Sequence, residues 1–419
     1  MTDIKIYQGN QIGGCITVIS TDSLKIVIDF GESLPGAGPV ENIDFDWVNE
    51  KVDAVFFTHY HGDHIGRFME IPENVPLYMG EVTWKVLINF YGAIRKPEYV
   101  DRLKNIKSIK ENINNINFIE ITKPIIIGDI KVTPYSVDHS AYDAYMFLVE
   151  TPDKNILHTG DYRDHGHRGH KIKNGKDQNV MLDVIKYYVK DHGKRKIDTL
   201  ITEGTMLGSR KNEKYYSEKQ MLVDATEFFK DHKYIFLKIS STNVDSLASF
   251  YKAAEKNGMG FYGSQYIMSQ LHVYREAGKK YRTNMYDFKN TWPILPNPNK
   301  EGLSKAQVHS STGQRKHMRE EGFVLLVSEN EAYEEIMAEF EDLNPVLIYS
   351  MWRGYIDKEI GGQAYNPKLA AFCNKYNAKI MHTGGHASPE FIGKVIEAAQ
   401  AKEVITIHTE GECRDRENN

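Results

Sequence analysis

The chain of 419 residues is long enough for two domains, or for one large domain with an insertion. Its hydrophobic content of 41% and charged content of 26% are those of an ordinary globular protein, and a net charge of −5 gives no global attraction to nucleic acid. Three cysteines without paired spacing, an N-terminus without a signal pattern and the lack of a long apolar run exclude a disulfide scaffold and a membrane span, so we expect a cytoplasmic protein.

The first thirty residues predict three short strands. β-rich runs cover Ile4 to Tyr7, Cys15 to Ile19 and Leu24 to Asp29, with a turn at Gly13-Gly14, which is the pattern of an antiparallel meander. The third run places Asp29 at the C-terminal end of a buried strand. Asp29 is either an ordinary turn residue or a carboxylate that orients a metal-bound histidine.

The next strand leads to a dense group of metal-ligand side chains. Val52 to Phe57 is an apolar run typical of a fully buried strand. The loop that follows contains His59, His61, Asp63 and His64, and Gly62 lets its backbone turn so that these side chains converge. Three imidazoles and a carboxylate suit zinc, or manganese at a mixed nitrogen and oxygen site. The spacing favours a metal site over a solvated polar loop.

Two further strand ends supply ligand types. A hairpin of Ile125 to Ile130 and Val132 to Tyr135 leads to His139. Strands follow over Tyr145 to Glu150 and Asn155 to His158, and the second of them ends in Thr159-Gly160-Asp161. A site at the edge of a sheet collects ligands in this way.

Residues 162–197 are rich in charge and contain His165, His167 and His170. These histidines could bind another metal ion. Two glycines leave the segment loose, and neither a carboxylate nor a cysteine completes a ligand set. We therefore favour a position near a substrate channel or in solvent.

From about residue 206 to 345 the pattern is that of a small α/β unit. Helices are predicted over Ser217 to His232 and Asn243 to Asn257, and they alternate with strands over Tyr234 to Ile239 and Phe323 to Val327.

The last part of the chain returns to the earlier pattern. Strands are predicted over Val346 to Tyr349 and Ala378 to His382, and Gly384-Gly385-His386-Ala387-Ser388 follows the second. After helix Pro389 to Ala401, strand Glu403 to Ile407 leads to His408. We therefore predict one catalytic domain, formed by residues 1–205 and 346–419, into which residues 206–345 are inserted.

Taken together, these residues resemble the metallo-β-lactamase superfamily and, within it, the β-CASP nucleases related to ribonuclease J and the mRNA 3′-end-processing endonuclease. In the order of the family motifs, the matching residues are Asp29, His59-x-His61-x-Asp63-His64, His139, Asp161, Glu203 after strand Ile197 to Thr202, His386 and His408. A true β-lactamase usually carries cysteine in place of Asp161. The resemblance covers nearly the whole chain and implies an α/β fold, an αββα sandwich with an inserted β-CASP α/β domain.

The family's chemistry is phosphodiester hydrolysis, so the resemblance implies a ribonuclease that acts on single-stranded RNA through water activated by two divalent metal ions. We expect zinc, with manganese as the alternative. By the resemblance, the first ion is held by His59, His61 and His139. The second is held by Asp63, His64 and His408, and Asp161 bridges the two.

The resemblance also implies catalytic roles for Asp29, Asp63, Glu203 and His386. A histidine supported by a carboxylate can give a proton to the departing oxygen, and His386 with Glu203 fits that role. The implied partner is single-stranded RNA without a membrane, and a homodimer is allowed. Alternatives are a thioester or lactone hydrolase of the superfamily, which lacks the matches at Glu203 and His386, a DNA nuclease, and a non-enzymatic scaffold.

The candidates for substrate contacts depart from the family pattern. Where ribonuclease J has a Gly- and Ser-rich loop that grips a terminal phosphate, this chain has Ser350-Met351-Trp352-Arg353-Gly354. Trp352 could stack on a base or belong to the core, and Arg353 could meet a phosphate from the side. Ser241 and Asn243, after strand Tyr234 to Ile239, and Ser388 remain as further phosphate contacts.

Overall fold

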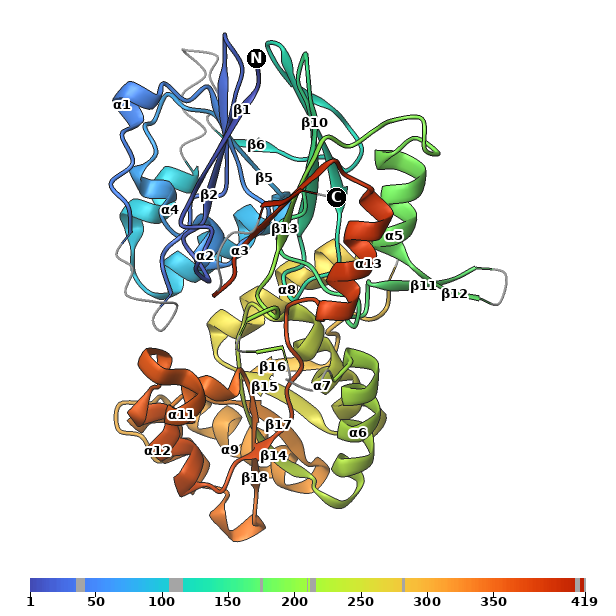
Figure 1. Ribbon diagram of the computed structural model, residues 1–419. Helices are drawn as coiled ribbons and strands as arrows, with labels where there is room; N and C mark the ends of the chain where they lie inside the picture. Colours follow the sequence, from blue (N-terminus) through green and yellow to red (C-terminus); the bar gives the residue numbers. More distant parts are fainter. Residues whose placement is uncertain are drawn as a thin grey trace. The chain divides into compact units, whose positions relative to one another are not determined.

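The computed structural model describes residues 1–34, 42–104, 116–173, 176–208, 210–211, 216–280, 283–410 and 415–417. The chain divides into two compact units (Figure 1). The first unit comprises Met1–Tyr215 and Gly385–Asn419, and the second comprises Tyr216–Gly384.

Two sheets form the centre of the first unit. The order of the first sheet is β1 (Asp3–Tyr7), β2 (Ile16–Ser20), β3 (Lys25–Ile28), β4 (Ala54–Phe56), β5 (Leu77–Met79) and β6 (Ile116–Phe118). The order of the second sheet is β21 (Asp415–Glu417), β20 (Glu403–Ile407), β13 (Thr199–Glu203), β10 (Asn155–His158), β9 (Tyr145–Glu150), β8 (Ile130–Ser136) and β7 (Ile125–Ile127). The predicted antiparallel meander is confirmed by the pairing of β1 with β2 and of β2 with β3, and the hairpin by that of β7 with β8.

The two sheets pack face to face. Alternate residues of neighbouring strands point into one core, so Ile26 and Ile28 of β3 and Phe56 of β4 share a cluster with Phe147 and Val149 of β9. The intervening side chains point to the outer faces. This alternation places a continuous apolar layer between the sheets.

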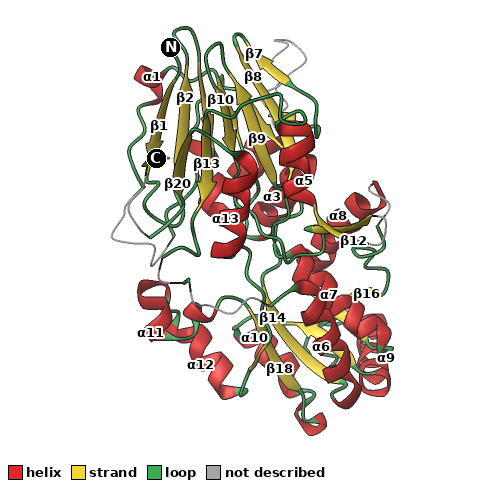
Figure 2. Ribbon diagram, turned by 45° about the vertical axis from the view of Figure 1, so that its right-hand side comes forward, coloured by secondary structure: helices red, strands yellow, loops and turns green. Residues whose placement is uncertain are grey.

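Helices cover both outer faces. α5 (Val180–Val184) and α13 (Pro389–Ala399) lie on the second sheet (Figure 2), where Phe391 and Ile392 pack with Met146 and Leu148. α3 (Glu81–Ala93) and α4 (Pro97–Lys104) lie beside the first sheet, and Trp84 contacts Phe118 of β6 with ring centroids 5.4 Å apart. The expected αββα sandwich is therefore confirmed.

The second unit is a parallel α/β layer structure. Its sheet has the order β16 (Thr291–Pro293), β15 (Gly260–Gly263), β17 (Phe323–Leu326), β14 (Tyr234–Ile239), β18 (Val346–Ser350) and β19 (Lys379–Ile380), and all these pairs are parallel. Its helices are α6 (Glu218–Asp231), α7 (Val244–Lys256), α8 (Gln265–Lys280), α9 (Lys305–Glu321), α10 (Glu331–Ala338), α11 (Lys358–Gly361) and α12 (Pro367–Lys375). Figure 1 shows α6 and α7 on one face of this sheet, and a cluster that includes Met318, Met337 and Phe372 joins α9, α10 and α12 to the other face. The expected further α/β domain is confirmed.

The division between the units differs from the predicted boundaries at residues 205 and 345. Residues 346–384 lie in the second unit, because β18 extends the parallel sheet beside β14, with Ile235 opposite Val346. The strand expected over Ala378 to His382 is β19 at the edge of the same sheet. The sequence shows that these runs are strands, but it does not show with which partner a parallel strand pairs.

Several elements were absent from the prediction. α9 buries only Ser311, Arg315 and Met318, so its sequence lacks a wide apolar stripe. Strands β5, β6 and β16 have three residues each, too few to display a period of two. Among the other unpredicted elements are the hairpin β11 (His170–Lys173) and β12 (Lys176–Asn179) and the short helices α1 (Trp47–Glu50) and α2 (Gly62–Ile65). Strands β15 and β21 and helices α4, α5, α8, α10 and α11 were not predicted either. None of the helices in the described ranges combines the length and the apolar character needed to cross a bilayer.

Candidate metal centre

The loop after β4 and the short helix α2 that follows it carry four of the expected ligands, and the residues after β3 hold the backbone of this segment. The N–H of Phe30 donates to the carbonyl oxygen of His64 at 2.7 Å. At the next residue, a Cβ on Gly31 would lie 1.7 Å from the carbonyl oxygen of Asp63. Only glycine therefore allows the two backbone segments to approach so closely.

Three histidines form the first cluster of converging ligand atoms. His59 and His61 come from this loop, and His139 comes from the segment after β8. Nδ1 of His61 lies 3.0 Å from Nε2 of His59 and 3.1 Å from Nε2 of His139. The three nitrogens thus face one point.

The outer nitrogens of two of these rings are already in use. Nδ1 of His139 lies 2.7 Å from the carbonyl oxygen of Gly385, which can only accept, so this nitrogen carries the proton and Nε2 holds a lone pair. Nδ1 of His59 lies 3.0 Å from the hydroxyl of Thr58, which itself donates to Asp29 at 2.7 Å. The geometry therefore directs both lone pairs toward His61.

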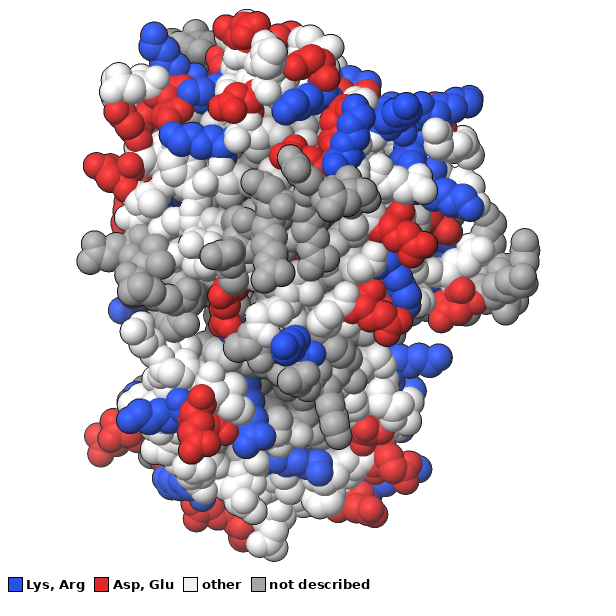
Figure 3. All heavy atoms as spheres, in the orientation of Figure 1, with Lys and Arg blue, Asp and Glu red and all other residues white. Residues whose placement is uncertain are grey.

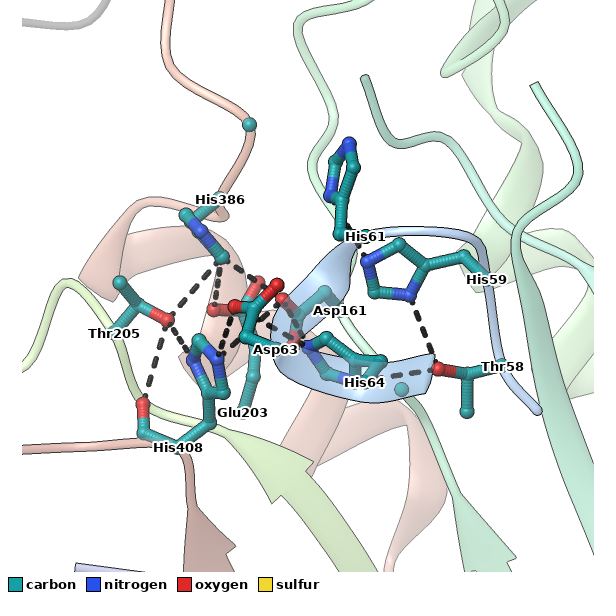
Figure 4. Close-up of polar contacts among 12 residues, drawn as sticks. Thr58, His59, His61, Asp63, His64, Asp161, Glu203, Thr205, His386 and His408 are labelled. Carbon is teal, nitrogen blue, oxygen red and sulfur yellow. Dashed lines mark hydrogen bonds and ion pairs between the residues drawn. The ribbon is translucent and has the colours of Figure 1, made fainter. Parts of the chain in front are cut away.

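The second cluster consists of Asp63, His64, Asp161 and His408 (Figure 4). Nε2 of His64 lies 3.1 Å from Oδ2 of Asp161, and Nε2 of His408 lies 3.2 Å from Oδ2 of Asp63. These side chains come from α2, from the turn after β10 and from the end of β20. Two nitrogens and two carboxylates thus meet in one place.

Asp29 orients the second cluster from behind. Its Oδ2 accepts a hydrogen bond from Nδ1 of His64 at 2.8 Å, and its Oδ1 accepts one from the N–H of Thr58 at 2.7 Å. Asp29 and His408 both have left-handed backbone conformations, with φ of 62° and 52°. Such conformations are uncommon outside glycine and are concentrated at functional sites.

Burial and charge set the protonation of these groups. Burial lowers the pKa of His59 and His139 well below the usual value, and that of His61 to about 4. Burial also lowers the pKa of His64, but Asp161, Asp29 and Asp63 outweigh it and raise this pKa well above its usual value. The first cluster is therefore a set of neutral imidazoles.

The carboxylates of the second cluster are ionised. Burial raises the pKa of Asp161, but His408, His64 and His386 outweigh it and hold this pKa well below its usual value. Burial likewise acts to raise the pKa of Asp63, and His64 and His408 lower it overall. Ionised carboxylates are the form that binds a divalent cation.

The donor set fits divalent metal ions. In the first cluster, Nδ1 of His61 can share a proton with Nε2 of His59 or with Nε2 of His139, but not with both at once. One of these three nitrogens therefore has a lone pair that faces no proton from the other two rings. A cation at the common point of the three nitrogens removes this conflict. The second cluster offers mixed nitrogen and oxygen ligands, which suits zinc or manganese.

His386 and Glu203 form a third group with Asp161 and His408. Nδ1 of His386 lies 3.0 Å from Oε2 of Glu203, while Oε1 of Glu203 accepts from the N–H of Tyr162 at 3.1 Å and of Ala387 at 3.2 Å. Burial lowers the pKa of His386, but Glu203 and Asp161 outweigh it and raise this pKa. His386 lies in the turn before α13 and not at the end of one of the strands of the first unit.

Three supporting residues were not predicted from the sequence. Thr58 connects Asp29 with His59, and Arg168 donates to the carbonyl oxygens of His139 and Ala141 at 2.6 and 2.8 Å. Thr205 contacts His408 at 2.8 Å. Thr58 directly precedes the motif residue His59 and Thr205 stands two residues after Glu203, and this proximity in sequence is the one signal that could have identified them.

The loop expected after β10 is held by another buried histidine. His158 accepts from the N–H of Gly160 at 3.2 Å, and its Nε2 lies 3.2 Å from the hydroxyl of Thr17. Burial lowers the pKa of His158 to about 4. A neutral His158 thereby fixes the turn that presents Asp161.

The three histidines after residue 162 lie outside these clusters. Among the residues that the structure describes, none of the groups of converging ligand atoms contains His165, His167 or His170. His170 instead pairs with Asp177 of the neighbouring strand at 2.9 Å. The expected position of these three histidines near a substrate channel or in solvent stays a prediction.

The expected substrate contacts have local structural roles. Ser388 caps α13 in the first unit by accepting from the N–H of Phe391 at 3.0 Å. In the second unit, Asn243 caps α7, and Ser241 bonds Tyr266 at 2.8 Å. Their contact with a substrate stays a prediction.

Trp352 and Arg353 also have neighbours within the second unit. The ring of Trp352 lies edge-on to Tyr355, with centroids 5.4 Å apart, and also covers Gly354. Arg353 pairs with Asp357 at 3.1 Å, but 61% of its side chain is exposed. Their roles in binding RNA stay predictions.

Comparisons with known proteins identify the first part of the chain. Residues 26–184 match the β-lactamase superfamily domain, which confirms the predicted resemblance to the metallo-β-lactamase superfamily. The chain is 25% identical over 202 residues to ribonuclease J from Helicobacter pylori, covering 46% of this chain and 26% of that protein. It is 26% identical over 162 residues to cleavage and polyadenylation specificity factor subunit 3-I from Arabidopsis thaliana, covering 37% of this chain and 23% of that protein.

These matches span about a quarter of the length of each curated relative. A crystal structure of a protein of unknown function from Enterococcus faecalis V583 covers 99% of this chain and 95% of its own, with 19% identity and a TM-score of 0.66. This likeness bears on the fold alone, and it extends over both units.

Proposed function

Since residues 26–184 of this chain match the β-lactamase superfamily domain, we propose that the protein is a metal-dependent phosphodiester hydrolase of β-CASP type that cleaves single-stranded RNA. The convergence of ligand atoms in the first unit carries this proposal. Its seven contributing side chains are His59, His61, Asp63, His64, His139, Asp161 and His408.

The residues divide into two ligand sets. His59, His61 and His139 would hold one divalent ion, and Asp63, His64 and His408 would hold the other. When bound, the two ions would lower the pKa of a water molecule and offset the negative charge that develops on the phosphate. Asp161 lies in the second cluster, and we propose that its carboxylate would also bind the ion held by the first cluster.

The chain itself supplies orientation. Asp29 and Thr58 accept from the outer nitrogens of His64 and His59, so that the inward nitrogens of both rings face the ligand sets. His64 would release its inward proton when a metal ion binds. The carbonyl oxygen of Gly385 likewise accepts from the outer nitrogen of His139. Removal of such a partner typically lowers metal affinity or activity about 10–100-fold.

His386 is the candidate proton donor to the departing oxygen. Glu203 accepts from its Nδ1, which leaves Nε2 to carry the proton that is transferred. The imidazole is 21% exposed, whereas the Glu203 side chain is 1% exposed, so one side of the pair can reach a substrate. A buried carboxylate behind a partly exposed histidine is the arrangement that general acid catalysis requires.

RNA is favoured as substrate by the names of the matched relatives, one a ribonuclease and one a cleavage and polyadenylation factor. Figure 3 shows acidic and basic side chains interspersed toward the top, bottom and right of the face drawn, in keeping with the net charge of −5. We therefore propose that individual side chains, Trp352, Arg353, Ser241, Asn243 and Ser388, contact the strand. The cytoplasmic location and a homodimer stay predictions.

One assay tests this function. Protein reconstituted with zinc, and in parallel with manganese, is incubated with end-labelled single-stranded RNA and DNA, with a thioester and with nitrocefin. We expect cleavage of RNA, and no turnover by a His59→Ala/His64→Ala variant, which has lost one ligand from each cluster. Turnover of the thioester or nitrocefin with intact RNA would refute the proposal, and preferential cleavage of DNA would make the protein a DNA nuclease.

A further inference from the structure

The hydroxyl of Thr205 contacts two histidines with different proposed roles. Its Oγ1 lies 2.8 Å from Nδ1 of His408 and 3.2 Å from Nδ1 of His386 (Figure 4). It also lies 3.3 Å from the carbonyl oxygen of His408. Thr205 is fully buried, so these contacts are made away from water.

The donors and acceptors around Thr205 determine which atom donates in each of these hydrogen bonds. Nε2 of His408 faces Asp63 in the second cluster, so a bound cation requires this nitrogen to be unprotonated. Nδ1 of His408 must then carry the proton and donate it to Oγ1 of Thr205. The hydroxyl can accept because its own proton has an acceptor in the His408 carbonyl oxygen.

The backbone brings Thr205 to this place. Thr205 follows β13 and His408 follows β20, and the two strands are parallel neighbours. Between Glu203 and Thr205, a Cβ on Gly204 would lie 2.4 Å from the methyl carbon of Thr406. The tripeptide Glu203-Gly204-Thr205 is thus pressed against the segment of His408, which itself has the uncommon φ of 52°.

We propose that Thr205 is a positioning residue of the metal centre. Its hydroxyl keeps His408 in the tautomer that presents Nε2 to the second ion, and it also restrains the ring of His386, the candidate proton donor. This inference rests on the proposed two-metal function. The proposed role of Thr205 differs from that of Glu203, because the carboxylate of Glu203 bonds His386 and Thr205 contacts both histidines.

The test measures metal binding directly and does not depend on finding the substrate. Zinc retention is followed by elemental analysis during competition with chelators of graded strength, for wild type, Thr205→Val and Thr205→Ser. Valine keeps the shape without the hydroxyl, and serine keeps the hydroxyl. Thr199→Val is the matched control, because Thr199 lies on the same strand, is buried, and donates to Glu403 at 2.8 Å, a residue of neither metal cluster.

We expect Thr205→Val to lower the affinity for one of the two bound ions about 10–100-fold, as for other residues that orient a ligand. Thr205→Ser should retain most of the affinity, and Thr199→Val should bind both ions as wild type does. A double-mutant cycle then locates the effect. In a His408→Ala background, Thr205→Val should cost little further affinity, because the ring that it orients is gone.

The outcomes separate the two proposals. A wild-type protein that binds no zinc or manganese overturns the proposed function and with it the role of Thr205. A wild-type protein that binds two ions, together with unchanged affinity in Thr205→Val, overturns the inference alone. Equal losses in Thr205→Val and Thr199→Val, or additive losses with His408→Ala, show a general effect on the fold and also overturn it.

Discussion

Replacing His386 by alanine separates proton donation from metal binding. The imidazole contacts Glu203 at 3.0 Å and lies 3.6 Å from Asp161. After its removal, Oε1 of Glu203 still accepts from two backbone N–H groups, so the carboxylate keeps partners and the local backbone keeps its anchor. We therefore expect the variant to fold and to retain both metal ions.

The expected loss of rate follows from the role of a general acid. Without a proton donor, RNA cleavage should fall roughly 10²–10⁴-fold. This corresponds to about 2.7–5.5 kcal/mol of transition-state stabilisation, since each factor of ten is about 1.36 kcal/mol. The loss should depend on the leaving group, because an oxygen that leaves as a stable anion needs no proton.

The assay compares RNA with bis-p-nitrophenyl phosphate, whose nitrophenolate departs unprotonated. We expect His386→Ala to lose the full factor on RNA and less than about tenfold on the activated diester. Metal content of the same preparations is measured in parallel. Equal losses on both substrates, loss of a metal ion, or near-normal RNA cleavage would refute the reasoning and favour His386 as a ligand in the third group.

Three further changes test other parts of the molecule. Asp161→Ala should reduce bound metal below two ions and abolish turnover; two ions found by elemental analysis would contradict the bridging role. Trp352→Ala should weaken RNA binding about tenfold or more if the ring stacks on a base, and cleavage should be nearly the same for 5′-monophosphate, 5′-triphosphate and 5′-hydroxyl forms of one RNA; a strong preference for the monophosphate would indicate a terminal-phosphate pocket instead. Arg168→Ala should lower both the melting temperature and the zinc affinity of the first cluster, because hydrogen bonds from a charged group to the carbonyl oxygens of His139 and Ala141 contribute roughly 1.5–3 kcal/mol each. Arg168→Lys should not restore these hydrogen bonds, since lysine lacks the planar fork of arginine. Unchanged zinc affinity in both variants would show that Arg168 does not support the site.

Local structure was largely readable from the sequence. Short runs rich in β-branched and aromatic residues identified β1, β8, β9 and β13, because such side chains suit a pleated strand even where both of its faces are buried, as in β9 and β13. The start of α13 also follows a local rule, since Ser388 caps this helix and Pro389 occupies its first position. The three-residue strands β5, β6 and β16 and the polar helix α9 were missed, because they are too short or too polar to show an apolar period.

The residues proposed as ligands could also be predicted, because metal chemistry restricts which side chains can bind an ion and the loop spacing brings four of them together. His139, Asp161 and His408 each follow a strand, and strand ends at one edge of a sheet are neighbours in space. The residues behind the ligands were not readable. Thr58, Thr205 and Arg168 are ordinary residue types whose value lies in the partner that folding places at hydrogen-bond distance.

The sequence by itself thus predicted the type of fold from local periodicity and, through its family resemblance, the side chains proposed as metal ligands and as the proton-donor pair. Only the tertiary structure decided that residues 346–384 complete the second unit, because the partner of a parallel strand is chosen by packing. It likewise decided the tautomers. Whether the inner nitrogen of His59, His139 or His408 is free to bind metal depends on Thr58, Gly385 and Thr205, and these contacts exist only when distant segments meet.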